Sequence, residues 1–271
     1  MRKARRNKGF VSGKVRNFFM VLLLFLGVFA VGYHYREALA YYFSFKTDKL
    51  NDEEKLHVIR NYQVMYGHQD KVIGFDVSQY QGKIDWEMTD SIDKAFPLDY
   101  VFIRATAGKD AVDSKFTANW AGAKNHNIIR GAYHYYRPNE NSLEQAENFI
   151  KTVRIEKGDL PPVLDIEKLP EEQSIDSLKV GLKRWLTAVE MHYKVKPIIY
   201  SGESYYNDFL KEEFSQYTFW IANYNFFVEE IDEDWLFWQF TERAFIPGIV
   251  GTVDVNIFNG TKKELKLYVK Q

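Results

Sequence analysis

From Lys71 onward, short apolar runs of strand-like composition alternate with longer segments of helix-like composition. The runs are rich in Val, Ile, Phe and Tyr, as buried strands are, and they occupy residues 72–77, 100–105, 131–135, 163–166, 198–200, 219–222, 236–240 and 253–255. The predicted helices occupy residues 84–95, 115–125, 142–153, 174–193 and 203–214. Strands that alternate with helices form parallel βα units. The sequence therefore predicts an α/β fold, a modified TIM-like barrel of about five βα units followed by three further strands, over residues 71–271.

The N-terminal region has a different pattern, a basic block followed by an apolar run. Residues 1–17 contain seven basic side chains and no acidic one, and residues 17–35 contain no Asp, Glu, Lys or Arg. A helix of this length rises about 28 Å, which matches the hydrocarbon thickness of a bilayer. The basic block before the run and Tyr33 and Tyr35 at its far end fit the positive-inside rule and the aromatic belt. We predict a cytoplasmic tail at 1–17 and a single transmembrane signal-anchor at 18–35.

This prediction places the rest of the chain on the outer side of the cytoplasmic membrane. Two other interpretations of the apolar run stay open. Residues 38–40 have the small-x-small form of a signal-peptide cleavage site, and cleavage would give a secreted protein. A buried core helix is the other alternative. Residues 36–70 mix charged and apolar residues at roughly helical spacing, and we interpret them as a stalk or linker without chemistry of its own.

Charge and cysteine content exclude several classes of function. The 254 residues after the basic block carry 29 basic and 37 acidic side chains. An acidic body of this kind argues against a nucleic-acid-binding protein, which needs a basic face for phosphate. The chain has no cysteine, which excludes disulfides, thiolate metal sites, iron–sulfur clusters and a cysteine nucleophile.

Carboxylates stand at the ends of predicted strands, where a parallel barrel places its functional groups. Asp76 lies near the end of the first apolar run, Asp165 and Glu167 stand at the end of the fourth, and Asp254 lies in the last. Asp165 and Glu167 are two residues apart, so both side chains point to the same face of a strand. Converging carboxylates suit glycoside hydrolysis, in which one carboxyl protonates the leaving oxygen and another supports the positive transition state. From spacing alone, a salt-bridged pair, a divalent metal site and, for each lone Asp, a turn or helix cap stay open.

Aromatic side chains make up 17% of the residues, enough to fill a core and still line a groove. Segments 133–136 and 237–240 are the richest candidates. Sugars stack their apolar faces on aromatic rings while a few polar groups bind the hydroxyls. His134, within the first segment, is interpreted as a hydrogen-bonded structural residue. The combined pattern favours a sugar-binding groove.

These motifs resemble glycoside hydrolase family 25, the Chalaropsis-type lysozymes or N-acetylmuramidases. The matching pieces run in family order: Gly74-Phe75-Asp76-Val77-Ser78-Gln79-Tyr80-Gln81-Gly82 with Ile84-Asp85-Trp86, Phe102-Ile103-Arg104-Ala105-Thr106, Gly131-Ala132-Tyr133-His134-Tyr135-Tyr136-Arg137-Pro138, Pro162-Val163-Leu164-Asp165-Ile166-Glu167, Pro197-Ile198-Ile199-Tyr200-Ser201, Trp220-Ile221-Ala222-Asn223-Tyr224, Trp238-Gln239-Phe240-Thr241 and Val253-Asp254-Val255-Asn256-Ile257-Phe258-Asn259-Gly260. Each piece alone is weakly specific, whereas the ordered series is highly specific. The resemblance covers residues 71–265.

The resemblance implies an activity and a role for each carboxylate. The implied reaction is hydrolysis of the β-1,4 bond between N-acetylmuramic acid and N-acetylglucosamine in peptidoglycan, without a metal or cofactor. Glu167 would be the general acid, and Asp165 would support the substrate's own acetamido group as it attacks the anomeric carbon. Asp76 and Asp254 would complete the catalytic set by holding sugar hydroxyls and tuning the pKa of Glu167. The implied substrate-binding residues are Tyr133, Tyr200, Trp220, Tyr224, Trp238 and Asn256.

One position departs from the family pattern. An acidic residue commonly follows the Thr after the second strand, and this chain has Ala107 there, which puts one substrate contact in doubt. Two alternatives to a muramidase stay open: a catalytically silent glycan-binding module on the same barrel, and a barrel hydrolase acting on chitin-like chains. A tethered enzyme would reach only the nearby wall, whereas a cleaved one would be freely secreted.

Overall fold

The computed structural model describes residues 13–44 and 52–271, so most of the predicted cytoplasmic tail lies outside the described residues. Eight strands close into a barrel. In ring order they are β1 (Val72–Val77), β3 (Phe96–Ala107), β5 (Ile129–Tyr135), β6 (Val163–Asp165), β7 (Ile198–Gly202), β8 (Thr218–Ala222), β9 (Phe237–Ala244) and β10 (Val253–Phe258). Neighbouring strands from β1 to β9 run parallel, whereas β10 is antiparallel to both β9 and β1. The predicted TIM-like barrel is confirmed.

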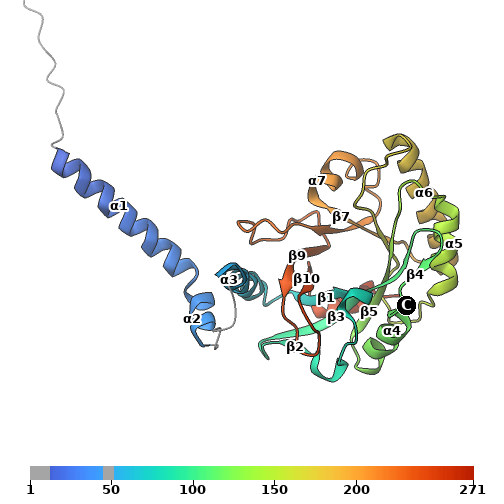
Figure 1. The fold of residues 1–271 in the computed structure, drawn as a ribbon, viewed down its shortest axis with the longest axis horizontal. Coiled ribbons are helices and arrows are strands. Elements are labelled where there is room, and N and C mark those ends of the chain that lie inside the picture. Colours follow the sequence, from blue (N-terminus) through green and yellow to red (C-terminus); the bar gives the residue numbers. More distant parts are fainter. Residues whose placement is uncertain (1–12, 45–51) are drawn as a thin grey trace, which may run out of the picture.

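Three long helices cover the outside of the barrel (Figure 1). They are α4 (Phe116–Asn125), α5 (Ser142–Thr152) and α6 (Ile175–Tyr193), and each agrees with its predicted range to within one residue. Side-chain capping sets where α5 and α6 begin: the side chain of Asn141 accepts from two backbone N–H groups of α5, and that of Ser174 accepts from one in α6. After β7, α7 (Glu203–Tyr205) is a single turn that continues as a π-helical turn, Tyr206–Leu210. The C-terminal helix α8 (Lys262–Tyr268) follows β10.

The predicted helix at residues 84–95 is wrong. This segment contains a 3₁₀ turn, Trp86–Met88, and a short strand, β2 (Ser91–Ile92), that pairs antiparallel with the beginning of β3. Asp93 and Lys94 both have positive φ angles, 53° and 58°. Together they form a tight turn closed by the bond from the backbone N–H of Ala95 to the carbonyl of Ile92 at 3.1 Å, and Ile92 pairs with Phe96 across a three-residue loop. The helix-like spacing of apolar residues here reflects a hairpin that extends β3 at its N-terminal end.

Aromatic rings fill the interior of the barrel. Phe102 stacks on Trp220 with ring centroids 4.4 Å apart, and Phe237 lies 5.3 Å from Phe102 and 5.5 Å from Tyr100. The ring of Tyr100 lies so close to Gly74 that a Cβ there would come within 2.6 Å of it. Only glycine fits at that position, which explains the Gly at the centre of β1. The packed rings form a rigid floor beneath the mouth of the barrel.

The N-terminal helix α1 (Gly13–His34) projects away from the barrel (Figure 1). Its segment Lys14–His34 has a mean hydropathy of 2.1 and is long enough to cross a membrane. None of its most apolar stretch is buried against the described chain, which overturns the alternative of a buried core helix. The end of α1 approaches the loop between β8 and β9, where His34 and Tyr35 both contact the carboxylate of Glu229.

Between α1 and the barrel lie α2 (Arg36–Ser44) and α3 (Asp52–Gly67), within the region predicted as a spacer. The α3 helix packs against β9. Its Arg60 is 1% exposed and donates to the carbonyl oxygens of Phe240 at 2.6 Å and of Asn225 and Val228 at 3.0 Å. A fourth, longer bond reaches the carbonyl of Phe226. One guanidinium thus joins α3, β9 and the β8–β9 loop.

We expect Arg60→Met to destabilise the whole barrel, because it keeps an apolar side chain of similar length but removes the donors for four backbone carbonyls. The free energy of unfolding should fall by about 3 kcal/mol, measured by urea denaturation of the full chain in detergent. Arg184→Met, at an exposed position of α6, is the matched control and should change it by less than about 0.5 kcal/mol. Equal effects of the two substitutions would contradict the role given to Arg60.

Candidate active site

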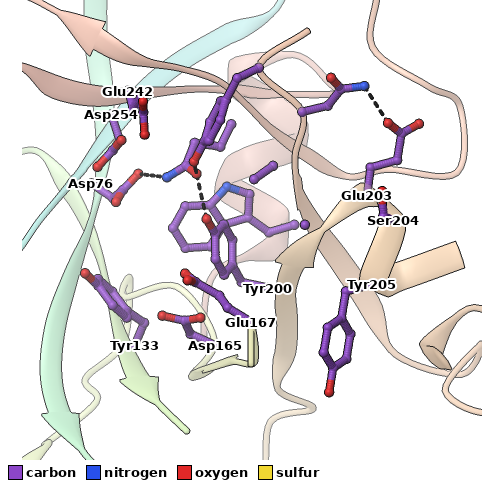
Figure 2. A pocket seen from close by; sticks show the side chains of 16 residues that line it. Asp76, Tyr133, Asp165, Glu167, Tyr200, Glu203, Ser204, Tyr205, Glu242 and Asp254 are labelled. Carbon is purple, nitrogen blue, oxygen red and sulfur yellow. Dashed lines mark hydrogen bonds between the residues drawn. The ribbon is translucent and has the colours of Figure 1, made fainter. Parts of the chain in front are cut away.

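A cavity of about 700 Å³ opens at the carboxyl ends of the barrel strands. Figure 2 shows Asp76, Asp254 and Glu242 gathered on one side of it, with Asp165 and Glu167 facing them from below. The side chains come from strands on opposite sides of the ring, so only closure of the barrel brings them together. The structure therefore unites all four carboxylates that the sequence indicated: Asp76, Asp165, Glu167 and Asp254.

Most of the predicted substrate-binding residues also line this cavity, namely Tyr133, Tyr200, Trp220 and Tyr224. Two do not. Asn256 is fully buried behind the cavity wall, where it supports other residues. Trp238 is also fully buried, but it packs against His68 and Phe240 in the outer core and donates to a backbone carbonyl.

Asp76 is the centre of a hydrogen-bonded network. Its Oδ2 accepts from Nε2 of Gln239 at 2.7 Å and from Nδ2 of Asn256 at 2.8 Å. The Oε1 of Gln239 accepts in turn from the hydroxyls of Tyr200 and Tyr224, and Oδ1 of Asn256 accepts from Nε1 of Trp220. Every member is thereby fixed by the next, which holds the cavity wall in one geometry.

Burial and the neighbouring Asp254 raise the pKa of Asp76, although the two amide donors oppose this change. Asp254 pairs directly with Asp76 across the antiparallel β1–β10 ladder. Its pKa is raised to about 7 by burial and then by the negative charges of Glu242 and Glu167. This side of the cavity therefore carries less negative charge at neutral pH than its three carboxyl groups suggest.

Asp165 and Glu167 form the second carboxyl group pair of the cavity. Burial raises the pKa of Asp165 well above its usual value, and the charge and hydrogen bonding of Glu167 raise it further. Glu167 is open to the cavity, yet the surrounding walls exclude enough water that its pKa is raised as well. The pair therefore keeps a proton at a pH where two isolated carboxyls would have lost both. The Oδ1 of Asp165 is buried without a hydrogen-bond partner.

The polar cavity residues that sequence reasoning missed include Glu203, Ser204, Asn223, Gln239 and Glu242. Gln239 could have been found, because it is two residues after Phe237, whose ring lies inside the barrel, and alternate strand residues share a face. The same alternation places Trp238 on the outer face. Glu203, the first residue of α7, accepts from the amide of Asn223 just after β8 at 2.8 Å, a contact between separate segments that no local pattern reveals.

His134 has the structural role that the sequence indicated. It is fully buried, its ring nitrogens contact Thr106 Oγ1 at 2.7 Å and Gln145 Oε1 at 3.1 Å, and its ring stacks on Trp185. Burial lowers its pKa to about 4, so it stays neutral. Within residues 13–44 and 52–271, no three His, Asp or Glu side chains form a group that could hold a metal ion.

Residues 75–249 match the family model for Glycosyl hydrolases family 25. The chain belongs to this family. It is therefore a glycoside hydrolase, as the ordered motifs predicted. The matched region contains Asp76, Asp165 and Glu167 and ends just before Asp254.

Individual relatives agree with this assignment. The chain is 34% identical to the protein YegX of Escherichia coli O6:H1 over 94% of this chain and 95% of that one. It is 32% identical to Lysozyme M1 of Streptomyces globisporus, over 72% of this chain and 70% of that one. The solved structure of a family 25 glycosyl hydrolase from Bacillus anthracis superposes with a TM-score of 0.66 at 30% identity, covering 74% of this chain and 95% of that one.

The raised pKa of Asp254 predicts a pH-dependent cost to stability. Because this carboxyl binds its proton more tightly in the folded chain, stability is lost as pH rises from about 4 to about 7. Asp254→Asn removes the charge, so we expect it to stabilise the protein by about 2–4 kcal/mol at pH 8 and little at pH 4. Urea denaturation at both pH values measures the difference. The exposed Asp208→Asn is the control, and a pH-independent effect of Asp254→Asn would contradict the explanation.

Proposed function

We propose that this protein is a lysozyme that cleaves the β-1,4 bond between N-acetylmuramic acid and N-acetylglucosamine of peptidoglycan. Family membership and the similarity to Lysozyme M1 support this substrate. The observation that carries the mechanism is the position of Asp165 and Glu167 in one cavity, with an unpartnered buried carboxyl oxygen on Asp165. Burial raises the pKa of both carboxyls.

In the proposed reaction, Glu167 donates its proton to the glycosidic oxygen as the bond to the anomeric carbon breaks. The carbonyl oxygen of the substrate's 2-acetamido group attacks that carbon from the other side and gives an oxazolinium-like intermediate. The Glu167 carboxylate then takes a proton from water, which opens the intermediate. Two displacements at one carbon retain its configuration.

The unpartnered Oδ1 of Asp165 suits the acetamido N–H of such a substrate. A buried carboxylate oxygen without a donor is costly, and an N–H pointing at it would stabilise the ionised form of Asp165. Because a negative charge on Asp165 raises the pKa of a neighbouring carboxyl, ionisation of Asp165 would favour the protonated form of Glu167. Substrate binding thus places the proton on the group that must donate it.

The other side of the cavity would hold the sugar ring. Asp76 and Asp254 would accept from hydroxyl groups, with Asp76 held in place by Gln239. Trp220 and Tyr200 provide rigid apolar walls, and the exposed Tyr224 lies at the rim. Tyr133, between Asp76 and Asp165 in the cavity, would bind near the acetamido group.

We expect Glu167→Gln to lower turnover about 10²–10⁴-fold, because the amide cannot protonate the leaving oxygen. Digestion of peptidoglycan, followed by mass spectrometry of the new reducing ends, should give muramic acid ends with the wild type only. Asp165→Asn should also lower turnover, while the exposed Glu147→Gln should not. With its raised pKa, Glu167 should keep the wild type active to higher pH than an ordinary glutamic acid would. Full activity of Glu167→Gln would contradict the proposal. Products from chitin but not from peptidoglycan would identify a chitin-like chain as the substrate instead.

We further propose that α1 is a membrane anchor and that the barrel acts on the wall next to the outer side of the cytoplasmic membrane. Since α3 is packed on the barrel, only residues 35–51 separate it from α1. With α2 helical, this connection spans at most about 40 Å. Such a short reach suits remodelling or local opening of the wall.

The anchor proposal predicts that the natural protein stays with the membrane fraction after a carbonate wash and keeps its original N-terminus. Mass spectrometry of the intact chain gives that N-terminus directly. Replacing Leu23 and Leu24 with Arg should release the protein, because charge in the middle of an apolar span is costly. A soluble wild-type chain that begins just after residue 40 would show instead that the segment is a cleaved signal.

A further inference from the structure

A second cavity, of about 450 Å³, lies on the β1–β3–β5 side of the barrel mouth. At two places, residues that are close in the chain line one cavity and the other. Tyr133 and Tyr135 lie two residues apart on β5, and Tyr133 lines the first cavity while Tyr135 lines the second. Lys168 lines the second cavity and directly follows Glu167, which lines the first. A substituent on a sugar held at Glu167 is therefore within reach of the second cavity.

The two cavities carry opposite charge. The active-site cavity has six carboxyl side chains among its described lining residues and no basic one. The second cavity is lined by Arg104, Arg137 and Lys168 against a single acid, Asp113. Such a separation within one mouth suits a ligand with a neutral sugar portion and an anionic branch.

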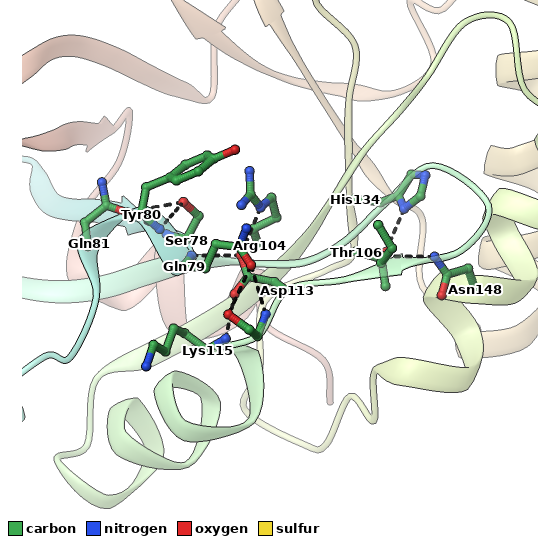
Figure 3. Close-up of polar contacts among 12 residues, drawn as sticks. Ser78, Gln79, Tyr80, Gln81, Arg104, Thr106, Asp113, Lys115, His134 and Asn148 are labelled. Atoms are coloured by element: carbon green, nitrogen blue, oxygen red, sulfur yellow. Dashed lines mark hydrogen bonds and ion pairs between the residues drawn. The ribbon is translucent and has the colours of Figure 1, made fainter.

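The carboxylate of Asp113 already accepts hydrogen bonds from other groups of the protein. Its side chain is 1% exposed and accepts from Nε of Arg104 and from the backbone N–H groups of Gln79 and Lys115, all at 2.8–2.9 Å. Figure 3 shows these contacts converging on Asp113. They hold Arg104 in position, where it also lies 4.7 Å above the ring of the exposed Tyr80. Arg104 is paired with Asp113, and Arg137 lies 3.1 Å from Glu140 and 3.9 Å from Asp110. The excess positive charge of the second cavity is therefore carried by Lys168, with Arg104 and Arg137 held in place as further donors.

Ala107 leaves room for this cavity. It lies at the end of β3, pairs with Ala111 of β4 (Ala111–Val112), and both small side chains line the cavity. An acidic side chain at position 107, as the family resemblance led us to expect, would fill part of this space and neutralise a neighbouring cation. Arg137 is held beside it by Glu140 at 3.1 Å. The departure at Ala107 thus both enlarges the cavity and makes it more positive.

We propose that the second cavity binds a carboxylate of the acidic peptide that is attached to the lactyl group of muramic acid. The inference rests on the proposed function and adds the peptide-bearing form of the glycan as its preferred substrate. Guanidinium groups bind carboxylates through paired, charge-assisted hydrogen bonds, and Tyr80 and Tyr135 offer apolar surface to the peptide. A bare sugar chain would leave this cavity unused.

Binding to the full-length Glu167→Gln chain in detergent tests this without turnover. The three probes for calorimetry are a disaccharide–tetrapeptide, the same compound with its peptide carboxyls converted to amides, and the disaccharide without peptide. Amidation should weaken binding about five- to tenfold, the effect of losing a partly exposed charge-assisted contact. Arg137→Gln and Ala107→Glu should each bring the ratio of the affinities for the charged and the amidated probe closer to one. Lys109 is an exposed cation between β3 and β4 that does not line the cavity. Its substitution Lys109→Gln should leave the preference for the charged peptide unchanged.

Each other outcome overturns the proposal in a distinguishable way. Equal affinity for the first two probes, or no binding of any probe, rules out recognition of the peptide carboxylates. Tightest binding of the peptide-free disaccharide assigns the cavity to the lactyl carboxylate instead. If Lys109→Gln loses the preference to the same extent, the preference comes from general surface charge and not from the second cavity. If the preference holds while the wild type releases no muramic acid ends from peptidoglycan, the proposed function fails and the binding site stands.

Discussion

Six carboxyl groups share one cavity, and no basic side chain of the described chain lines it. Burial and mutual repulsion raise the pKa values of Asp76, Asp165, Glu167 and Asp254. The cavity therefore keeps protons to higher pH than isolated carboxyls would, and a retained proton is what a general acid requires. Burying these carboxyl groups lowers the stability of the folded protein, and the same burial keeps a proton available for catalysis.

The rest of the barrel holds these groups in place. The antiparallel β10 closes the ring and sets Asp254 beside Asp76, while the aromatic interior gives both a rigid floor. The amides of Gln239 and Asn256 fix Asp76 and link it to the aromatic wall. Further out, Arg60 of α3 binds the loop that follows Asn223 and Tyr224. The α3 helix and the active-site wall are therefore parts of one folded unit.

Much of this could be predicted from the sequence, because apolar runs and their terminal carboxylates are local patterns. The eight strands and the convergence of Asp76, Asp165, Glu167 and Asp254 follow from them. The predictions that failed depended on tertiary contacts or on which face of a strand each residue occupies. The hairpin at 84–95 needed two left-handed residues, and the choice of Trp238 over Gln239 mistook the outer face of β9 for the inner one. The docking of α3 rests on Arg60, a charged residue whose burial no hydropathy pattern indicates.

The central claim is that Glu167 acts as the acid while the substrate's acetamido group, supported by Asp165, is the nucleophile. The anomeric configuration of the first product tests it most directly. Proton NMR recorded during the first minutes of digestion of a soluble glycan fragment, before mutarotation, resolves the two anomers of the new muramic acid end. The account predicts the β anomer, because two displacements retain configuration. Initial formation of the α anomer would mean a single displacement by water and would contradict the account.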